Sequence, residues 1–280
     1  MHSFLVVSLL FAAANPLPEG KSSVEIQFDT LPLKLFTYKP KAYSDGPMIM
    51  VFHGVLRNAE EYRDDSIEMG DRFQALIVAP LFDAQSFPKP KYQFGGIVRD
   101  GKAAPREEWT GEYVNRIAKA IRERENRPQL PLYLIGHSGG GQFLIRMAAF
   151  VKTDARRIVV ANSGTFLFPT REAEFPFGLG GLPPELQTDE HLQAYLAQPV
   201  TIYLGSKDIE RDEYLDVIPA ADAQGQVRFE RGKNVFAAAK KLAEERQWHF
   251  GWKLVIADDV EHDHTKMFNH SQCATALELK

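Results

Sequence analysis

Residues 130–145 (LPLYLIGHSGGGQFLI) constrain the fold most, because they place a serine at a glycine-flanked corner between two apolar stretches. Residues 130–135 have the pattern of a buried strand, and an apolar helical stripe follows the corner directly. Gly136 and Gly140 stand two residues before and after Ser138. A sharp strand-to-helix turn leaves no room for side chains at these two positions and makes the serine project from the backbone. The segment therefore predicts a strand–turn–helix unit that presents a serine hydroxyl for attack on a carbonyl.

The rest of the chain alternates strand and helix patterns. Two runs predict a hairpin around Asp29-Thr30, and six continuous apolar runs are typical of buried strands. The hairpin runs are 24–28 and 33–38, and the apolar runs are 48–52, 75–79, 132–135, 158–161, 200–204 and 253–256. Residues 113–124 and 234–246 have the pattern of amphipathic helices. Eight strands, with helices from the third onward, predict the α/β class and one mostly parallel, doubly wound sheet.

The composition is that of one globular domain. With 280 residues, of which 44% are hydrophobic, the chain is long enough for a single large α/β core. Its 33 basic and 37 acidic residues are interspersed and give a formal net charge of −4. This balance gives no reason to expect nucleic acid or an anionic membrane as a partner.

The first residues have the pattern of an export signal. An apolar run over residues 4–14 ends in Ala12-Ala13-Ala14, which fits a cleavage site, and it is too short to span a bilayer. We therefore expect a signal peptide over residues 1–14, a single domain over 15–280 and a secreted or periplasmic protein. No Lys or Arg precedes the run, so a buried N-terminal strand or helix is the alternative. Cys273 is the only cysteine, which excludes an internal disulfide, and we expect it to be a packed residue.

Two long segments follow predicted strands. Residues 165–198 are rich in Phe, Pro and Gly, whereas residues 209–232 are more polar. Both would leave the carboxyl ends of strands, where open α/β sheets bind ligands. We expect residues 165–199 to form a lid or a substrate-facing insertion, with packing onto the body as the alternative. Among the aromatic residues of the loops, the candidates for substrate contact are Phe166, Tyr92 and Phe94, for which ordinary packing is equally consistent.

The serine requires an acid and a base, and both have candidates in the chain order Ser, Asp, His. Asp208 follows the strand over 200–204, so its carboxylate should lie at the same sheet edge as Ser138. Asp212 and Asp216 are nearby substitutes for it.

The base should come from the loop after the last strand. His262 is the favoured base and His264 its competitor. A His-x-His pair with flanking acids could also bind a divalent cation, but no second ligand cluster with suitable spacing is evident in the sequence. We therefore expect no metal. Asp263 and His264 are expected to cap the helix that follows.

The oxyanion of an acyl-transfer reaction needs backbone N–H donors. Gly139, next after the serine, supplies one, and Val55, just beyond His53-Gly54, supplies the other, with Leu56 as the alternative. Asn58 has a structural explanation, since it can cap a helix beginning at Ala59, with Glu61 completing a capping box.

These pieces resemble the α/β-hydrolase superfamily, and more narrowly the polyhydroxybutyrate-depolymerase-like esterases and related bacterial hydrolases. The matching segments, in order, are VFHGVLRNAEEYRD, LIVAPLFDAQSFP, LIGHSGGGQF, TIYLGSKD and DVEHDHTKMF. The resemblance implies ester hydrolysis without a metal or an organic cofactor, and it places the family's histidine at His262. Asp259 and Glu261 depart from the small residues that are usual there, and an acid beside the base could raise its pKa.

The predicted function is therefore a serine hydrolase with the triad Ser138, Asp208 and His262, which cleaves short-chain or polymeric carboxylic esters through an acyl-enzyme. A peptidase or amidase with the same triad is one alternative. A non-catalytic binding protein with this fold is the other.

Overall fold

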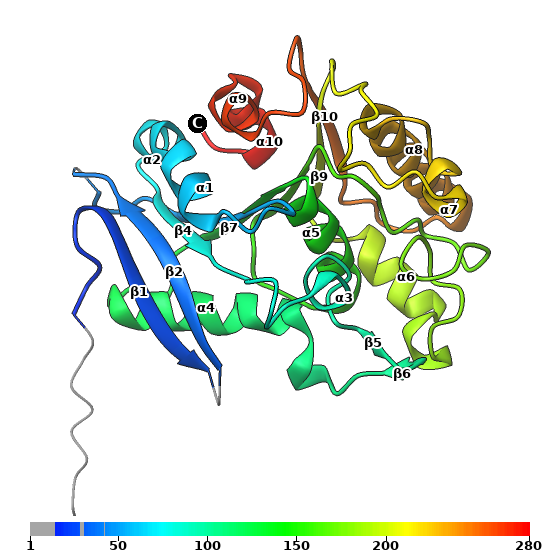
Figure 1. The fold of residues 1–280 in the computed structure, drawn as a ribbon, viewed down its shortest axis with the longest axis horizontal. Coiled ribbons are helices and arrows are strands. Elements are labelled where there is room, and N and C mark those ends of the chain that lie inside the picture. The colour runs from blue at the N-terminus through cyan, green and yellow to red at the C-terminus, as the bar shows by residue number, and fades with distance from the viewer. Residues whose placement is uncertain (1–14, 29–30, 42) are drawn as a thin grey trace, which may run out of the picture.

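The computed structural model describes residues 15–28, 31–41 and 43–280, so the predicted signal peptide over 1–14 lies outside the described residues. Its centre is an eight-stranded sheet in the order β1-β2-β4-β3-β7-β8-β9-β10 (Figure 1). The strands are β1 (Gly20–Phe28), β2 (Leu31–Lys39), β3 (Met48–Phe52), β4 (Leu76–Pro80), β7 (Leu132–His137), β8 (Arg157–Ala161), β9 (Val200–Gly205) and β10 (Lys253–Ala257). All eight predicted strands are confirmed.

Six of these strands run parallel, and the hairpin β1–β2 joins the sheet edge antiparallel to β4. The register brings the carboxyl ends of the central strands level. Phe52 pairs with Gly136, and Ala161 pairs with both His137 and Tyr203. Loops that follow β3, β7, β9 and β10 therefore meet at one sheet edge.

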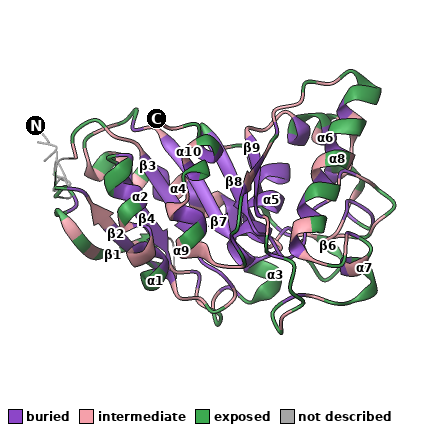
Figure 2. Cartoon of the chain, turned by 90° about the horizontal axis from the view of Figure 1, so that it is seen from above, coloured by how far each residue is buried: buried purple, intermediate pink, exposed green. Residues whose placement is uncertain are grey.

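Helices cover both faces because side chains alternate along each central strand. In β3, Met48, Met50 and Phe52 pack into a core with helices α4, α5, α6 and α8, whereas Ile49 and Val51 pack into the opposite core with α1, α2, α9 and α10. The first set is α4 (Thr110–Arg124), α5 (Gly139–Phe150), α6 (Asp189–Leu196) and α8 (Arg228–Arg246), and the second is α1 (Ala59–Asp65), α2 (Ile67–Arg72), α9 (His264–Asn269) and α10 (Gln272–Leu277). Figure 2 shows the buried residues concentrated in the central strands and α5. The predicted helices over 113–124 and 234–246 are confirmed within α4 and α8.

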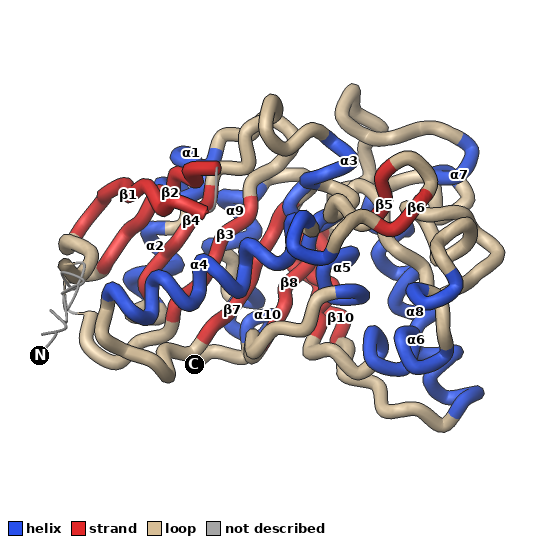
Figure 3. Tube along the Cα trace, turned by 90° about the horizontal axis from the view of Figure 1, so that it is seen from below, coloured by secondary structure: helices blue, strands red, loops and turns tan. Residues whose placement is uncertain are grey.

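Smaller elements fill the long connections. They are α3 (Lys89–Tyr92), β5 (Val98–Arg99), β6 (Lys102–Ala103), α7 (Pro219–Asp222) and two 3-10 turns, η1 (Arg106–Glu108) and η2 (Pro184–Leu186). Figure 3 shows the hairpin of β5 and β6 and the helices α6, α7 and α8 gathered at one end of the molecule. No helix in the described part of the chain is long and apolar enough to cross a membrane.

The glycines of the corner are required by its packing. A Cβ added at Gly136 would lie 2.5 Å from the backbone of Gly140, and one at Gly140 would lie 2.2 Å from the carbonyl oxygen of Phe52. Backbone atoms cannot move aside as a flexible side chain can, so no other residue fits at either position. The requirement predicted from the sequence is confirmed.

Residues 165–199 pack onto α5. The buried guanidinium of Arg146 donates to the carbonyl oxygen of Pro176 at 2.8 Å and to the hydroxyl of Thr165 at 3.1 Å. The hydroxyl of Tyr195 donates to the carbonyl oxygen of Leu167 at 2.9 Å. The bonds of Arg146 hold the segment against the body, as the packing alternative expected, whereas the bond of Tyr195 joins two parts of the segment itself.

Cys273 is fully buried, and burial raises the pKa of its thiol to about 12, as expected of a packed residue.

Candidate active site

Ser138 occupies the strained corner between β7 and α5. Its φ of 55° and ψ of −115° lie in a region that a non-glycine residue rarely adopts. The backbone N–H of Ser138 donates to the carbonyl oxygen of Ala161 on β8, and its carbonyl oxygen accepts from Gln142 in the first turn of α5, both at 3.0 Å. Bonds on both sides thus hold the strain in place and fix where the hydroxyl projects.

Asp208 and His262 are paired across 54 residues of sequence. The distance from His262 Nδ1 to Asp208 Oδ2 is 2.8 Å, and the carboxylate is 1% exposed. Behind it, Arg228 Nη1 lies 3.5 Å from the other carboxylate oxygen. The two substitutes are engaged elsewhere, because Asp212 binds Arg228 with both oxygens and Asp216 binds Lys89.

His264 has a separate partner. Its Nε2 lies 2.7 Å from Asp65 Oδ2, and its ring stacks on Tyr62 with centroids 4.0 Å apart. His262 and His264 thus bind different carboxylates rather than converging as a His-x-His chelate. The helix cap comes from Asp263 alone, whose side chain accepts from the N–H of Lys266 at 2.9 Å.

The two predicted oxyanion donors lie together. A Cβ added at Gly139 would lie 3.2 Å from the backbone nitrogen of Val55, so the two residues face one another. Within the described part of the chain, neither N–H has a hydrogen-bond acceptor. Gly139 is the first residue of α5, where N–H groups have no intrahelical acceptor and the helix dipole favours negative charge. Two free N–H groups at this point can receive an oxyanion.

The buried His53 fixes the loop that carries Val55. Its Nε2 accepts from the N–H of Phe82 at 3.1 Å, and its Nδ1 bonds the carbonyl oxygen of Gly54 at 3.0 Å. The accepting role requires Nε2 to be unprotonated, so Nδ1 carries the proton. Burial lowers the pKa of His53 to about 4, and the ring is neutral at physiological pH.

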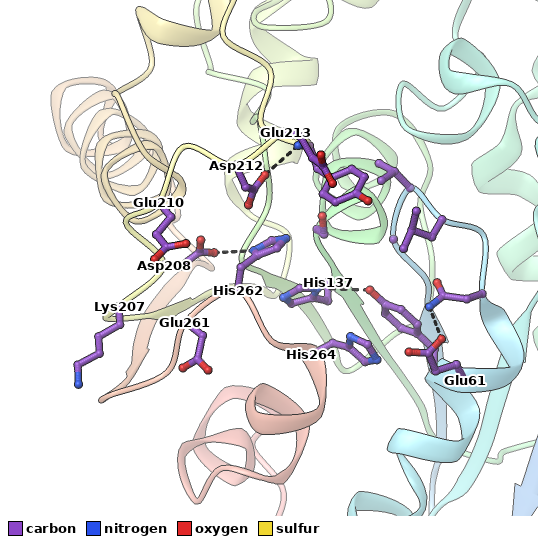
Figure 4. Close-up of a pocket in the computed structure, with 17 residues that line it drawn as sticks. Glu61, His137, Lys207, Asp208, Glu210, Asp212, Glu213, Glu261, His262 and His264 are labelled. Atoms are coloured by element: carbon purple, nitrogen blue, oxygen red, sulfur yellow. Dashed lines mark hydrogen bonds and ion pairs between the residues drawn. The ribbon is translucent and has the colours of Figure 1, made fainter.

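Ser138, Asp208 and His262 line one cavity of about 550 Å³ at the carboxyl edge of the sheet (Figure 4). Val55 and Leu56 line it after β3, and His264 lines it after β10. The polar segment after β9 supplies Glu210, Asp212, Glu213 and Tyr214. Among the described residues, no hydrogen bond joins Ser138 to His262, which is common in the absence of substrate.

Two solved structures match this chain over nearly its whole length. Poly(aspartic acid) hydrolase-1 from Sphingomonas sp. KT-1 is 31% identical, with a TM-score of 0.85 over 94% of this chain and 99% of that one. LpqC, a poly(3-hydroxybutyrate) depolymerase from Bordetella parapertussis, is 35% identical, with a TM-score of 0.84 over 92% and 90%. The chain belongs to this family of α/β serine hydrolases. The S-formylglutathione hydrolase from Agrobacterium tumefaciens, at 14% identity and a TM-score of 0.57, shares the fold. No family model and no curated protein matches the sequence.

Membership in this hydrolase family confirms the predicted fold class and the predicted resemblance. It also makes a non-catalytic role the weaker alternative.

The structure corrects the expectation that three aromatic residues contact the substrate of this hydrolase. Tyr92 and Phe166 are fully buried, and neither lines the cavity. Tyr92 instead donates its hydroxyl to the carbonyl oxygen of His53 at 2.7 Å and so supports the oxyanion loop from below. Phe94 also lies outside the cavity, under the guanidinium of Arg146. Composition alone could not separate aromatic packing from aromatic contact with substrate.

None of residues 165–199 lines the cavity, and the lid or substrate-facing role expected for them stays a prediction. The other long segment does line the cavity, since four of its five residues from 210 to 214, all except Arg211, are lining residues. Its polarity was a usable signal in the sequence.

Sequence reasoning missed His137, which occupies the variable position of the corner. Its ring lies 4.5 Å from that of His262, and its Nδ1 lies 3.3 Å from the Tyr62 hydroxyl. Its Nε2 is buried and has no partner among the described residues. Burial, together with the nearby His262, His264 and Arg228, holds the pKa of His137 well below its usual value.

Asn58 begins α1 as predicted, but its side chain makes no backbone cap. Its amide donates to Glu61 at 2.7 Å instead. The predicted capping box is therefore wrong in its bonds although correct in its helix start.

Proposed function

We propose that this chain hydrolyses carboxylic esters through a Ser138–His262–Asp208 triad and an acyl-enzyme intermediate. The single observation that carries the proposal is the 2.8 Å bond between Asp208 and His262, placed in the same cavity as Ser138. The free N–H groups of Gly139 and Val55 complete the set of groups that acyl transfer requires.

The chemistry proceeds in two steps. The Asp208 carboxylate accepts from His262 Nδ1–H, which leaves the lone pair of Nε2 to take the hydroxyl proton of Ser138. The serine oxygen then bonds to the ester carbonyl carbon, and the N–H groups of Gly139 and Val55 hold the resulting oxyanion. Collapse breaks the bond to the alcohol, which leaves with the proton from His262.

Water resolves the acyl-enzyme by the same route. His262 takes a proton from water, the hydroxide oxygen bonds to the acyl carbon, and Ser138 leaves with the proton that His262 returns. The products are a carboxylic acid and an alcohol. No metal or organic cofactor takes part in this scheme.

The substrate is proposed as a short-chain or polymeric ester. The likeness to a poly(3-hydroxybutyrate) depolymerase supports an ester, whereas the likeness to a poly(aspartic acid) hydrolase supports the alternative of an amide. Rates on p-nitrophenyl esters and peptide anilides distinguish them. We expect ester hydrolysis, lowered by several orders of magnitude in Ser138→Ala; full ester activity in that variant would overturn the proposal.

We also propose that the chain is exported through residues 1–14, as the apolar run predicts. N-terminal sequencing of the mature protein tests this, and a chain that retains Met1 inside the cell would contradict it.

A further inference from the structure

The catalytic cavity is strongly acidic. Six carboxylates line it, against one lysine, Lys207. Three of the six have a cationic partner within the fold, and two of these three lie at the triad. Asp208 has His262 and Arg228 beside it, and Asp212 binds Arg228 at 2.6 and 2.7 Å. These two belong to the triad and its support.

Three carboxylates at the rim of the cavity have no cationic side chain as a partner among the described residues. Glu61, Glu210 and Glu213 are exposed, and none of them forms an ion pair with any described residue. Glu261 is paired with Lys266. Lys207 does not offset the others, because it binds Asp259 at 2.9 Å, and its amino group points away from His262 (Figure 4).

An exposed aromatic ring lies beside these charges. Tyr214 lines the cavity, yet it is 50% exposed, and the neighbouring Glu213 raises the pKa of its hydroxyl. An aromatic face next to carboxylates attracts a cation through its quadrupole as well as through charge.

The floor of the cavity also points to a ligand. The side chain of His137 is 2% exposed and lines the cavity, and its Nε2 has no partner among the described residues. A buried polar atom without a partner is costly unless a ligand or water satisfies it. His137 thus offers a polar contact to a ligand in the same cavity that Glu210, Glu213 and Tyr214 line.

We infer that the preferred substrate of this site is an ester that carries a positive charge, such as a quaternary ammonium or a protonated amine, outside the scissile bond. The inference rests on the proposed esterase function. Carboxylates around a cleft concentrate cationic ligands and raise their association rate, an effect that salt screens. The same field repels a polyanion, so the inference predicts that poly(aspartic acid) is a poor substrate for this chain.

The test uses pairs of esters matched in shape. Choline butyrate is compared with 3,3-dimethylbutyl butyrate, and the ethyl ester of 4-(trimethylammonio)butyrate with that of 5,5-dimethylhexanoate. We expect at least one cationic ester to exceed its neutral partner in kcat/KM by about 10-fold or more at low salt. The advantage should shrink as ionic strength rises.

Removing the rim charge should abolish the preference. In Glu210→Gln/Glu213→Gln the ratio of kcat/KM for the cationic ester to that for its neutral partner should fall several-fold. Glu172→Gln/Glu185→Gln is the matched control, since it removes two exposed charges outside the cavity. Equal or faster hydrolysis of both neutral esters, or an effect of the rim variant no larger than the control, would overturn the inference. If no ester is cleaved and Ser138 resists a fluorophosphonate, the esterase proposal itself has failed.

Discussion

The imidazole of His137 lies against that of His262, with ring centroids 4.5 Å apart and planes tilted by 38°. His262 is thus held between a carboxylate at its Nδ1 edge and a neutral, buried ring at its face. We propose that His137 positions His262 through this ring contact. Because His137 adjoins Ser138 in the chain, one strand end places both the nucleophile and the support of its base.

Replacing His137 tests this support. His137→Ala removes the ring against which His262 rests, and a misplaced base costs on the order of 10²-fold in rate. We expect kcat to fall by roughly 10- to 100-fold with KM nearly unchanged, measured on a p-nitrophenyl ester. His249→Ala, at an exposed position, is the control. A variant with unchanged kcat would show that the ring contact does not matter.

Asp208 should hold His262 in the tautomer that carries its proton on Nδ1. Asp208→Asn keeps the shape but replaces the accepting carboxylate, so we expect kcat to fall by about 10⁴-fold. Asp212→Asn, which alters the same Arg228 environment without touching His262, should have a much smaller effect. Comparable losses in the two variants would show that the acid has been assigned to the wrong residue.

Alanine substitutions at Gly139 and Gly140 should have different effects, the first on kcat and the second on stability. Gly139→Ala places a methyl group 3.2 Å from the nitrogen of Val55, which disturbs the paired N–H donors, and losing one such donor costs about 10²–10³-fold in kcat. Gly140→Ala places it 2.2 Å from the carbonyl oxygen of Phe52, so we expect an insoluble or strongly destabilised chain. Thermal unfolding and kcat of each variant separate the two outcomes. An active, stable Gly140→Ala would contradict the packing of the corner.

The free energy of unfolding should decrease as the pH falls below 6.5, because two buried histidines are held neutral by the fold. The pKa of His53 is about 4 in the fold and 6.5 when free, and the pKa of His137 is also lowered. Between these values the unfolded chain binds protons that the folded chain does not, so the free energy of unfolding decreases as pH falls from 6.5 toward 4. For His53 the loss is about 3 kcal/mol over this range.

Chemical denaturation across pH measures this dependence. His53→Gln removes one titrating ring, so the slope of the unfolding free energy against pH should become shallower, while the exposed His249→Gln should leave it unchanged. An identical slope in His53→Gln would mean that His53 is not held neutral by the fold.

The strands and the corner could be predicted because their signals are local. Continuous apolar runs such as 48–52 correspond to buried strands, and Gly136 and Gly140 are explained by backbone contacts that any such turn makes. The pairing of Asp208 with His262 was predictable because parallel strands end at one edge.

The surroundings of the triad could not be predicted in the same way. Whether Tyr92 faces substrate or supports His53 from below depends on the path of a loop between distant elements. His264 binds Asp65, which is 199 residues away in the sequence, because α9 lies beside α1. The sequence carries no signal for this contact. His137 carried no signal, because any residue fits the variable position of the motif.

The most direct test of the account is to map the covalent adduct formed by a fluorophosphonate with peptide mass spectrometry. The account predicts a single adduct on Ser138, with loss of ester hydrolysis in proportion to labelling and no adduct in Ser138→Ala. An adduct on another residue, or ester hydrolysis that survives complete labelling of Ser138, would contradict it.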